Sequence, residues 1–95
     1  MTKLALTIAG SDSSSEVGIQ SDLRTFAMHI VHGASALTCI TAQNSVGVNQ
    51  VDVPSVSMVK AQIQAVAEDF KVDAVKVGML LNHQNVKAVA QKVQD

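Results

Sequence analysis

The chain has 95 residues, of which 47% are hydrophobic and 16% charged, and its formal net charge is −1. This length allows one core at most, and the composition favours a globular protein over a disordered one. The charge excludes a strongly basic surface for nucleic acid or an anionic membrane, and no apolar run approaches the roughly 20 residues of a membrane span. The one cysteine, Cys39, excludes an internal disulfide and favours a cytoplasmic protein.

The first half of the chain predicts a strand, a loop, a helix and a second strand. Residues 3–9 are a short apolar run, typical of a strand buried on both faces, and the polar residues 10–18 follow as a loop. A helix that ends at Gly33 would then bury apolar residues spaced three or four apart, namely Ile19, Leu23, Phe26 and Ile30. Residues 34–42 contain enough β-branched side chains to predict a second buried strand.

The second half predicts an extended segment, a helix, a strand and a last helix. Valines at residues 46–53 indicate a short third strand or a flap with a turn or bulge. Ser55 is placed to cap a helix whose buried stripe would be Val56, Val59, Ile63, Val66 and Phe70. Residues 74–80 predict a further strand. Asn82 is placed to cap a last helix with an apolar face of Val86, Val89 and Val93.

This order of elements predicts an α/β fold, with an open, mostly parallel sheet between flanking helices in three layers. Ligands of such sheets bind outside the carboxyl ends of the strands. We therefore expect the loop after the first strand, Gln43 after the second and Met79 after the last to lie at one mouth. Asp22, near the start of the first helix, faces either this mouth or solvent.

The residues alone leave the role of the loop at 10–18 open. It matches neither a P-loop nor the glycine spacing of a dinucleotide-binding fingerprint, so it is either a ligand-binding loop or an ordinary strand-to-helix turn. Asp12 has the same two interpretations, as a capping residue or a functional one. The three histidines have no ligand spacing, and we expect no metal site.

Three motifs occur in order along the chain. Residues 10–26 read GSDSSSEVGIQSDLRTF, residues 41–44 read TAQN, and residues 75–80 read VKVGML. Together they resemble the hydroxymethylpyrimidine/phosphomethylpyrimidine kinases of thiamine biosynthesis. The resemblance implies a ribokinase-like fold, ATP and Mg²⁺ as co-substrate and metal, and phosphorylation of 4-amino-5-hydroxymethyl-2-methylpyrimidine and then of its monophosphate.

The resemblance also implies a pyrimidine pocket formed by Gly10, Val17, Asp22, Gln43 and Met79. An aminopyrimidine offers ring nitrogens and an exocyclic amine, which the Gln43 amide and the Asp22 carboxylate can pair with directionally. Met79 would supply a polarizable wall for the flat ring. Ser15 and Glu16 stand where the family generally has two glycines, which reduces the backbone freedom of the loop and adds a negative charge.

In the resembling family, the anion hole, the catalytic aspartate and the nucleotide site lie in the C-terminal half. We therefore expect residues 1–95 to be the N-terminal portion of a ribokinase-like kinase domain, with no catalytic residue, no tight binding of ATP or Mg²⁺ and no activity alone. The alternative is a non-catalytic remnant, or an α/β module that binds small molecules or partners. An exposed edge strand and helix face would favour a homo-oligomer or other self-association.

Overall fold

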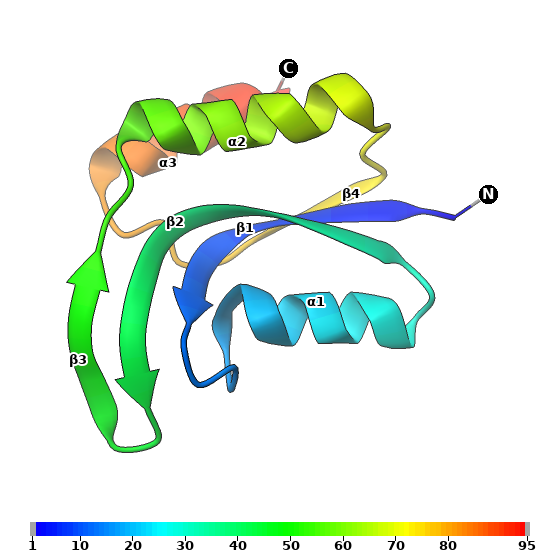
Figure 1. Ribbon diagram of the computed structural model, residues 1–95. Helices are drawn as coiled ribbons and strands as arrows, with labels where there is room; N and C mark the ends of the chain where they lie inside the picture. Colours follow the sequence, from blue (N-terminus) through cyan, green and yellow to red (C-terminus); the bar gives the residue numbers. More distant parts are fainter. Residues whose placement is uncertain (1, 95) are drawn as a thin grey trace.

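A four-stranded sheet lies between helices on both faces in the computed structural model, which describes residues 2–94 (Figure 1). The strands are β1 (Leu4–Asp12), β2 (His32–Asn44), β3 (Gly47–Asp52) and β4 (Ala74–Val77). Their order in the sheet is β3-β2-β1-β4, and β1 pairs in parallel with β2 and β4, whereas β3 is antiparallel to β2. The helices are α1 (Gly18–Met28), α2 (Val56–Asp69) and α3 (His83–Gln94).

The helices form the two outer layers, with α1 on one face of the sheet and α2 and α3 on the other (Figure 1). The predicted three-layer, mostly parallel α/β fold is therefore confirmed. The main core lies between the sheet and the α2–α3 layer, where Leu6 and Ile8 of β1 cluster with Val59, Ile63 and Val89. Full burial of one such side chain contributes about 1.5–3 kcal/mol.

Helix α1 ends at Met28, earlier than the apolar spacing predicts. Ile30 lies outside the helix with φ at +58° and is 83% exposed, so its place in the buried stripe was a wrong prediction. Gly33 does not end the helix either, because it lies within β2. A Cβ on Gly33 would lie 2.7 Å from Leu23 Cδ2, so this glycine allows α1 to approach β2 closely.

The strands differ in length from the predicted ones. Strand β1 continues through Asp12 and β2 through Asn44, so Gly10 and Gln43 lie within strands. Strand β4 ends at Val77, earlier than predicted. Strand β3 confirms the predicted short third strand, and its pairing with β2 shifts register at Gln43. Gly10 and Gln43, which were predicted to lie in a loop and a turn, therefore belong to the carboxyl ends of β1 and β2.

The predicted caps of the last two helices are confirmed. The Ser55 hydroxyl accepts a hydrogen bond of 3.1 Å from the backbone N–H of Met58 at the start of α2. The side-chain oxygen of Asn82 accepts one of 2.9 Å from the backbone N–H of Asn85 at the start of α3. These side chains satisfy backbone donors that have no partner within the helix.

The buried faces of these helices differ in part from the predicted ones. Helix α2 buries Val59 and Ile63 as predicted, but Phe70 lies just past its end, where its ring stacks on His32 with centroids 5.6 Å apart. Helix α3 buries Asn85, Ala88 and Val89, while Val86 and Val93 are 48% and 51% exposed. The predicted apolar face of α3 was therefore wrong except for Val89. Within residues 2–94, the helices lack the length and apolarity needed to cross a membrane.

Candidate functional site

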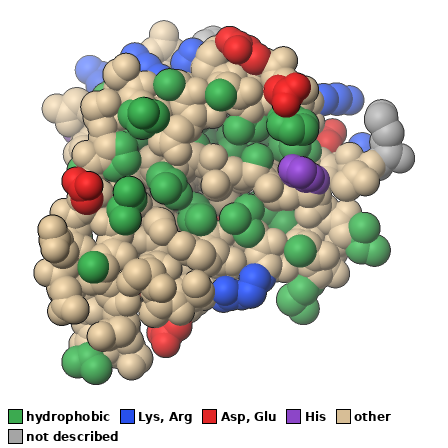
Figure 2. Space-filling view, viewed as in Figure 1, with side chains coloured by type: hydrophobic (Ala, Val, Ile, Leu, Met, Phe, Trp, Pro, Cys, Tyr) green, Lys and Arg blue, Asp and Glu red, His purple; other side chains and the backbone are tan. Residues whose placement is uncertain are grey.

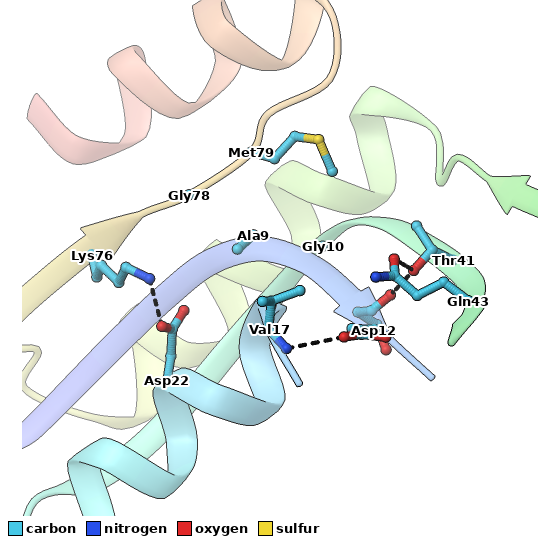
Figure 3. A pocket seen from close by; sticks show the side chains of 12 residues that line it. Ala9, Gly10, Asp12, Val17, Asp22, Thr41, Gln43, Lys76, Gly78 and Met79 are labelled. Carbon is cyan, nitrogen blue, oxygen red and sulfur yellow. Dashed lines mark hydrogen bonds and ion pairs between the residues drawn. The ribbon is translucent and has the colours of Figure 1, made fainter. Parts of the chain in front are cut away.

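A cavity of about 260 Å³ opens at the carboxyl ends of β1 and β2 and beside the segment that follows β4. All the residues predicted for the pocket line it, namely Gly10, Val17, Asp22, Gln43 and Met79. In Figure 3, Asp22 lies on one side of this cavity and Gln43 on the other, with Val17 between them. The structure thus brings together side chains that are more than thirty positions apart along the chain, as the strand-end rule predicts.

Asp12 holds the loop that joins β1 to α1. Its carboxylate is buried and accepts hydrogen bonds from the backbone N–H groups of Ser14, Glu16 and Val17 and from the Ser14 hydroxyl. Burial opposes ionisation, but the hydrogen bonds from Val17, Ser14 and Glu16 outweigh it, so the pKa of Asp12 is lowered. Asp12 does not cap α1, whose N-cap residue Val17 makes no side-chain capping bond, but by bonding to the loop N–H groups Asp12 positions Val17 at the cavity.

The loop adopts a backbone shape that suits glycine at Ser15. The φ angle of Ser15 is +65°, in the left-handed region that non-glycine residues rarely occupy. The guanidinium of Arg24 donates a hydrogen bond of 2.5 Å to the Ser15 carbonyl, and Glu16 is exposed beside it. The side chains of Ser15 and Glu16 are thus accommodated in the loop, with backbone strain at Ser15.

The end of β2 forms the side of the cavity around Gln43. The Thr41 hydroxyl lies 2.7 Å from the Gln43 amide oxygen and 2.8 Å from the Ser11 carbonyl oxygen. The backbone N–H of Gln43 donates to the Ser13 hydroxyl at 2.8 Å, and that hydroxyl donates to the Gln43 carbonyl at 2.7 Å. These contacts fix both the backbone and the amide of Gln43 against the loop.

Met79 covers the cavity from the segment after β4 (Figure 3). Its carbonyl accepts a hydrogen bond of 2.5 Å from the Thr38 hydroxyl, and the backbone N–H of Gly78 donates to the Ile8 carbonyl at 2.8 Å. The Met79 side chain itself is 55% exposed. Backbone contacts therefore hold the segment in place, while the thioether remains free to contact a ligand.

The carboxylate of Asp22 is held by side chains from the two strands beside it, β1 and β4. Its two carboxylate oxygens accept hydrogen bonds from Lys76 Nζ at 2.5 Å and from the Thr7 hydroxyl at 2.6 Å. Burial opposes ionisation, but the hydrogen bonds from Lys76 and Thr7 and the charge of Lys76 lower the pKa of Asp22. Asp22 therefore faces the mouth and not solvent, which decides between the two alternatives left by the sequence.

Sequence reasoning missed Lys76 and Thr41 as cavity residues. Lys76 stands between two valines in a strand, so the two-residue alternation of strands puts it on the face opposite to theirs, which was the available signal. Residues 2–94 contain no group of three or more His, Cys, Asp or Glu side chains that could hold a metal ion. Cys39 is fully buried, as predicted, and burial raises the pKa of its thiol.

A second cavity, of about 290 Å³, lies at the opposite end of β1, beside Lys3, His32, Phe70 and Asp73. It contains none of the residues predicted to bind a ligand. The predicted ligand residues thus gather at the carboxyl end of the sheet.

The sequence and the fold are similar to those of known kinases. The family model described as phosphomethylpyrimidine kinase matches residues 12–95. A hydroxymethylpyrimidine/phosphomethylpyrimidine kinase of Synechococcus elongatus is 55% identical over 87 residues, which cover 92% of this chain and 33% of that protein. The crystal structure of phosphomethylpyrimidine kinase from Clostridium difficile superposes with a TM-score of 0.94 at 42% identity, covering 98% of this chain and 40% of that one.

The structural similarity extends to a kinase that is named for another substrate, pyridoxal. A pyridoxal kinase from Bacillus subtilis, solved as an ADP complex, superposes with a TM-score of 0.89 at 38% identity, covering 99% of this chain and 37% of that one. The chain spans about a third of the length of the curated relatives it matches.

Proposed function

Because the chain belongs to the phosphomethylpyrimidine kinase family, we propose that its cavity binds 4-amino-5-hydroxymethyl-2-methylpyrimidine and the monophosphate of that pyrimidine. The proposed role of the whole enzyme is phosphorylation of these compounds in thiamine biosynthesis. We place this role in the cytoplasm, where a free, buried cysteine such as Cys39 stays reduced.

One observation carries the proposal: the residues that the family resemblance assigns to the pyrimidine line a single cavity. Asp22 offers an anionic acceptor for the exocyclic amine, and Gln43 offers an amide for a ring nitrogen. Val17 and Met79 offer apolar surface to the two faces of the ring. Gly10 contributes backbone to the cavity wall, and a Cβ there would lie 2.6 Å from Cys39 Sγ, so its lack of a side chain lets β1 pack against Cys39.

We further propose that phosphoryl transfer needs parts of the relatives outside the matched region, since the chain spans about a third of their length. Such transfer depends on groups that hold the nucleotide phosphates and the metal, with ATP as co-substrate and Mg²⁺ as the metal. The two carboxylates at this cavity already have hydrogen-bond donors, Asp12 from the loop and Asp22 from Lys76 and Thr7, and no group of three His, Cys, Asp or Glu side chains that could hold a metal ion occurs within residues 2–94. The chain alone would therefore bind pyrimidine but neither hold ATP tightly nor transfer phosphate.

Calorimetric titration of the 95-residue chain with the hydroxymethylpyrimidine tests this proposal. We expect saturable binding to the wild-type chain and weaker binding to Asp22→Asn and Gln43→Ala. The matched controls are Asp52→Asn and Gln50→Ala, both on the exposed strand β3, and they should bind as the wild type does. Absence of binding to a folded wild-type chain would overturn the proposal.

The alternative function is a non-catalytic α/β module that binds another small molecule or a partner. Pyridoxal is the second ligand to titrate, because the fold similarity includes a pyridoxal kinase. Binding of pyridoxal but not of the pyrimidine, weakened by the same two substitutions, would favour this second candidate. Turnover of ATP by the isolated chain would contradict the proposed division between binding and transfer.

A further inference from the structure

Lys76 lines the cavity but has no part in the ligand contacts proposed above. It lies on β4 directly beside Thr7 of β1 in the register of the two parallel strands. From these neighbouring positions, Lys76 and Thr7 each donate to a different carboxylate oxygen of Asp22, at 2.5 and 2.6 Å. The sheet thus fixes the orientation of a carboxylate that belongs to helix α1.

Lys76 is also the one cationic side chain among the described residues that line the cavity. The other charged lining residues are Asp12 and Asp22, and the carboxylate of Asp12 accepts its hydrogen bonds from the loop. Cys39 of β2 is a further titratable group at this end of the sheet, and it is fully buried. The charge of Asp22 is therefore balanced by Lys76 alone within the described site.

We propose, on the basis of the proposed pyrimidine-binding function, that Lys76 is a positioning residue that orients the Asp22 carboxylate and balances its charge. The cavity then recognises a neutral aminopyrimidine in preference to a cationic one. An ionised carboxylate has about four lone-pair sites, of which Thr7 and Lys76 occupy one each, so acceptor sites remain for the ligand amine. The Lys76 side chain is 55% exposed and that of Asp22 only 10%, so the ion pair joins a more open side chain to an enclosed carboxylate.

Removal of Lys76 changes the kind of ligand that suits the site. An enclosed carboxylate without its counter-ion attracts a cation, and a pyrimidine whose ring nitrogen is protonated is such a cation. The neutral pyrimidine, in contrast, loses an acceptor that was held in place. Lys76 would therefore determine how pyrimidine binding depends on pH.

The first test measures Asp22 directly, without a ligand. Carboxyl-carbon NMR follows the titration of Asp22 in the wild type, Lys76→Met, Lys76→Arg and the control Lys87→Met, which removes an exposed lysine from α3. We expect Lys76→Met to raise the pH at which Asp22 titrates, and Lys76→Arg and Lys87→Met to leave it near the wild-type value. Equal titration of Asp22 in Lys76→Met and Lys87→Met, with folded amide spectra, would overturn the proposal.

The second test measures pyrimidine binding by calorimetry from about pH 5 to about pH 8. At the upper end of this pH range, we expect the pyrimidine to bind about tenfold more weakly to Lys76→Met than to the wild type. The reason is that the ligand amine loses its charge-assisted hydrogen bond to a carboxylate that Lys76 holds in position. This deficit should shrink as the pH falls and the ring becomes protonated, and Lys76→Arg should restore the wild-type profile.

The outcomes separate this proposal from the function on which it rests. If the pyrimidine affinity of Lys76→Met changed with pH in parallel with that of the wild type, Lys76 would have no role in selecting the charge of the ligand. No binding to the wild type at any pH would overturn the proposed function, and with it the ligand selectivity ascribed to Lys76. The NMR titration would still decide whether Lys76 sets the charge of Asp22.

Discussion

Gly18 lies so close to Gly10 that a Cβ on Gly18 would approach the Gly10 carbonyl oxygen to 2.6 Å. The φ angle of Gly18 is +72°, in the left-handed region that favours glycine. The first residue of α1 and the end of β1 thus meet backbone to backbone at the cavity. A side chain at position 18 would force them apart.

Gly18→Ala should therefore destabilise the chain by more than about 1 kcal/mol, because left-handed strain and a backbone clash add. Urea unfolding measures this change. The control is Gly47→Ala, where a Cβ would meet no described atom within 4 Å. Equal stability of the two variants would show that the contact between Gly18 and Gly10 is not as close as described.

Ser15→Gly should stabilise the chain, by about 0.5–1 kcal/mol, because glycine adopts the φ of +65° without a Cβ penalty. Thermal unfolding of this variant should be compared with that of Ser45→Gly. Ser45 is a turn residue that is not among those with positive φ, so glycine there gains nothing. A lower midpoint for Ser15→Gly than for the wild type would contradict the strain at this position.

Stability should fall in acid because of Asp22. Its pKa is lowered in the folded chain, despite the opposing effect of burial, by Lys76 and Thr7. The stabilisation is therefore complete above the unfolded value of about 3.9 and is lost as the pH falls through the lower folded value. Asp22→Asn should flatten the dependence of the melting temperature on pH in this range, while Asp52→Asn should keep the wild-type slope.

Ser55→Ala should cost about 1 kcal/mol, because α2 loses the side chain that accepts the Met58 N–H. For a chain of this size, the melting temperature should fall by about 4–8 °C. Ser57→Ala, in the exposed first turn of the same helix, should be neutral or slightly stabilising. Similar effects of the two substitutions would contradict the capping role.

Self-association through the edge of β4 is a further prediction. Within residues 2–94, this strand pairs only with β1, and its Val75 and Val77 are 40% and 45% exposed. The hydrophobic side chains that gather across the middle of the face in Figure 2 lie elsewhere, since β4 runs behind β1 in that view. We expect concentration-dependent dimers in sedimentation velocity, weakened by Val77→Lys but not by Val48→Lys on the opposite edge. A monomer at every concentration would contradict this prediction.

Strand order alone predicts that the carboxyl ends of neighbouring parallel strands meet at one mouth, whereas the choice of particular pyrimidine-binding residues rested on the family resemblance. Gly10, Gln43 and Met79 needed only the strand order to be brought to one mouth. Lys76 was not predicted, because its role depends on the register between β4 and β1, which puts it beside Thr7 and beneath Asp22. The pattern of one strand does not show which residue of a strand far away in the sequence lies beside it, as Thr7 lies beside Lys76.

Errors in the predicted fold have similar causes. Helix α1 ends before Ile30, because the chain turns there with Ile30 at positive φ, and the N–H groups of Ile30 and Val31 donate back to the Ala27 and Phe26 carbonyls. In α3, Asn85 is fully buried and donates to the Leu80 carbonyl at 2.8 Å, so a polar side chain takes a place that periodicity reserves for an apolar one. Local hydrogen bonds thus overrode the apolar pattern.

Backbone amide NMR of the chain, titrated with the hydroxymethylpyrimidine, tests the central claim most directly. The account predicts saturable shifts confined to the amides of the cavity, including Gly10, Val17 and Gln43, with little change around His32 and Phe70 at the second cavity. Shifts centred on the second cavity, or none at saturating ligand, would contradict the assignment of the pyrimidine site to the carboxyl end of the sheet.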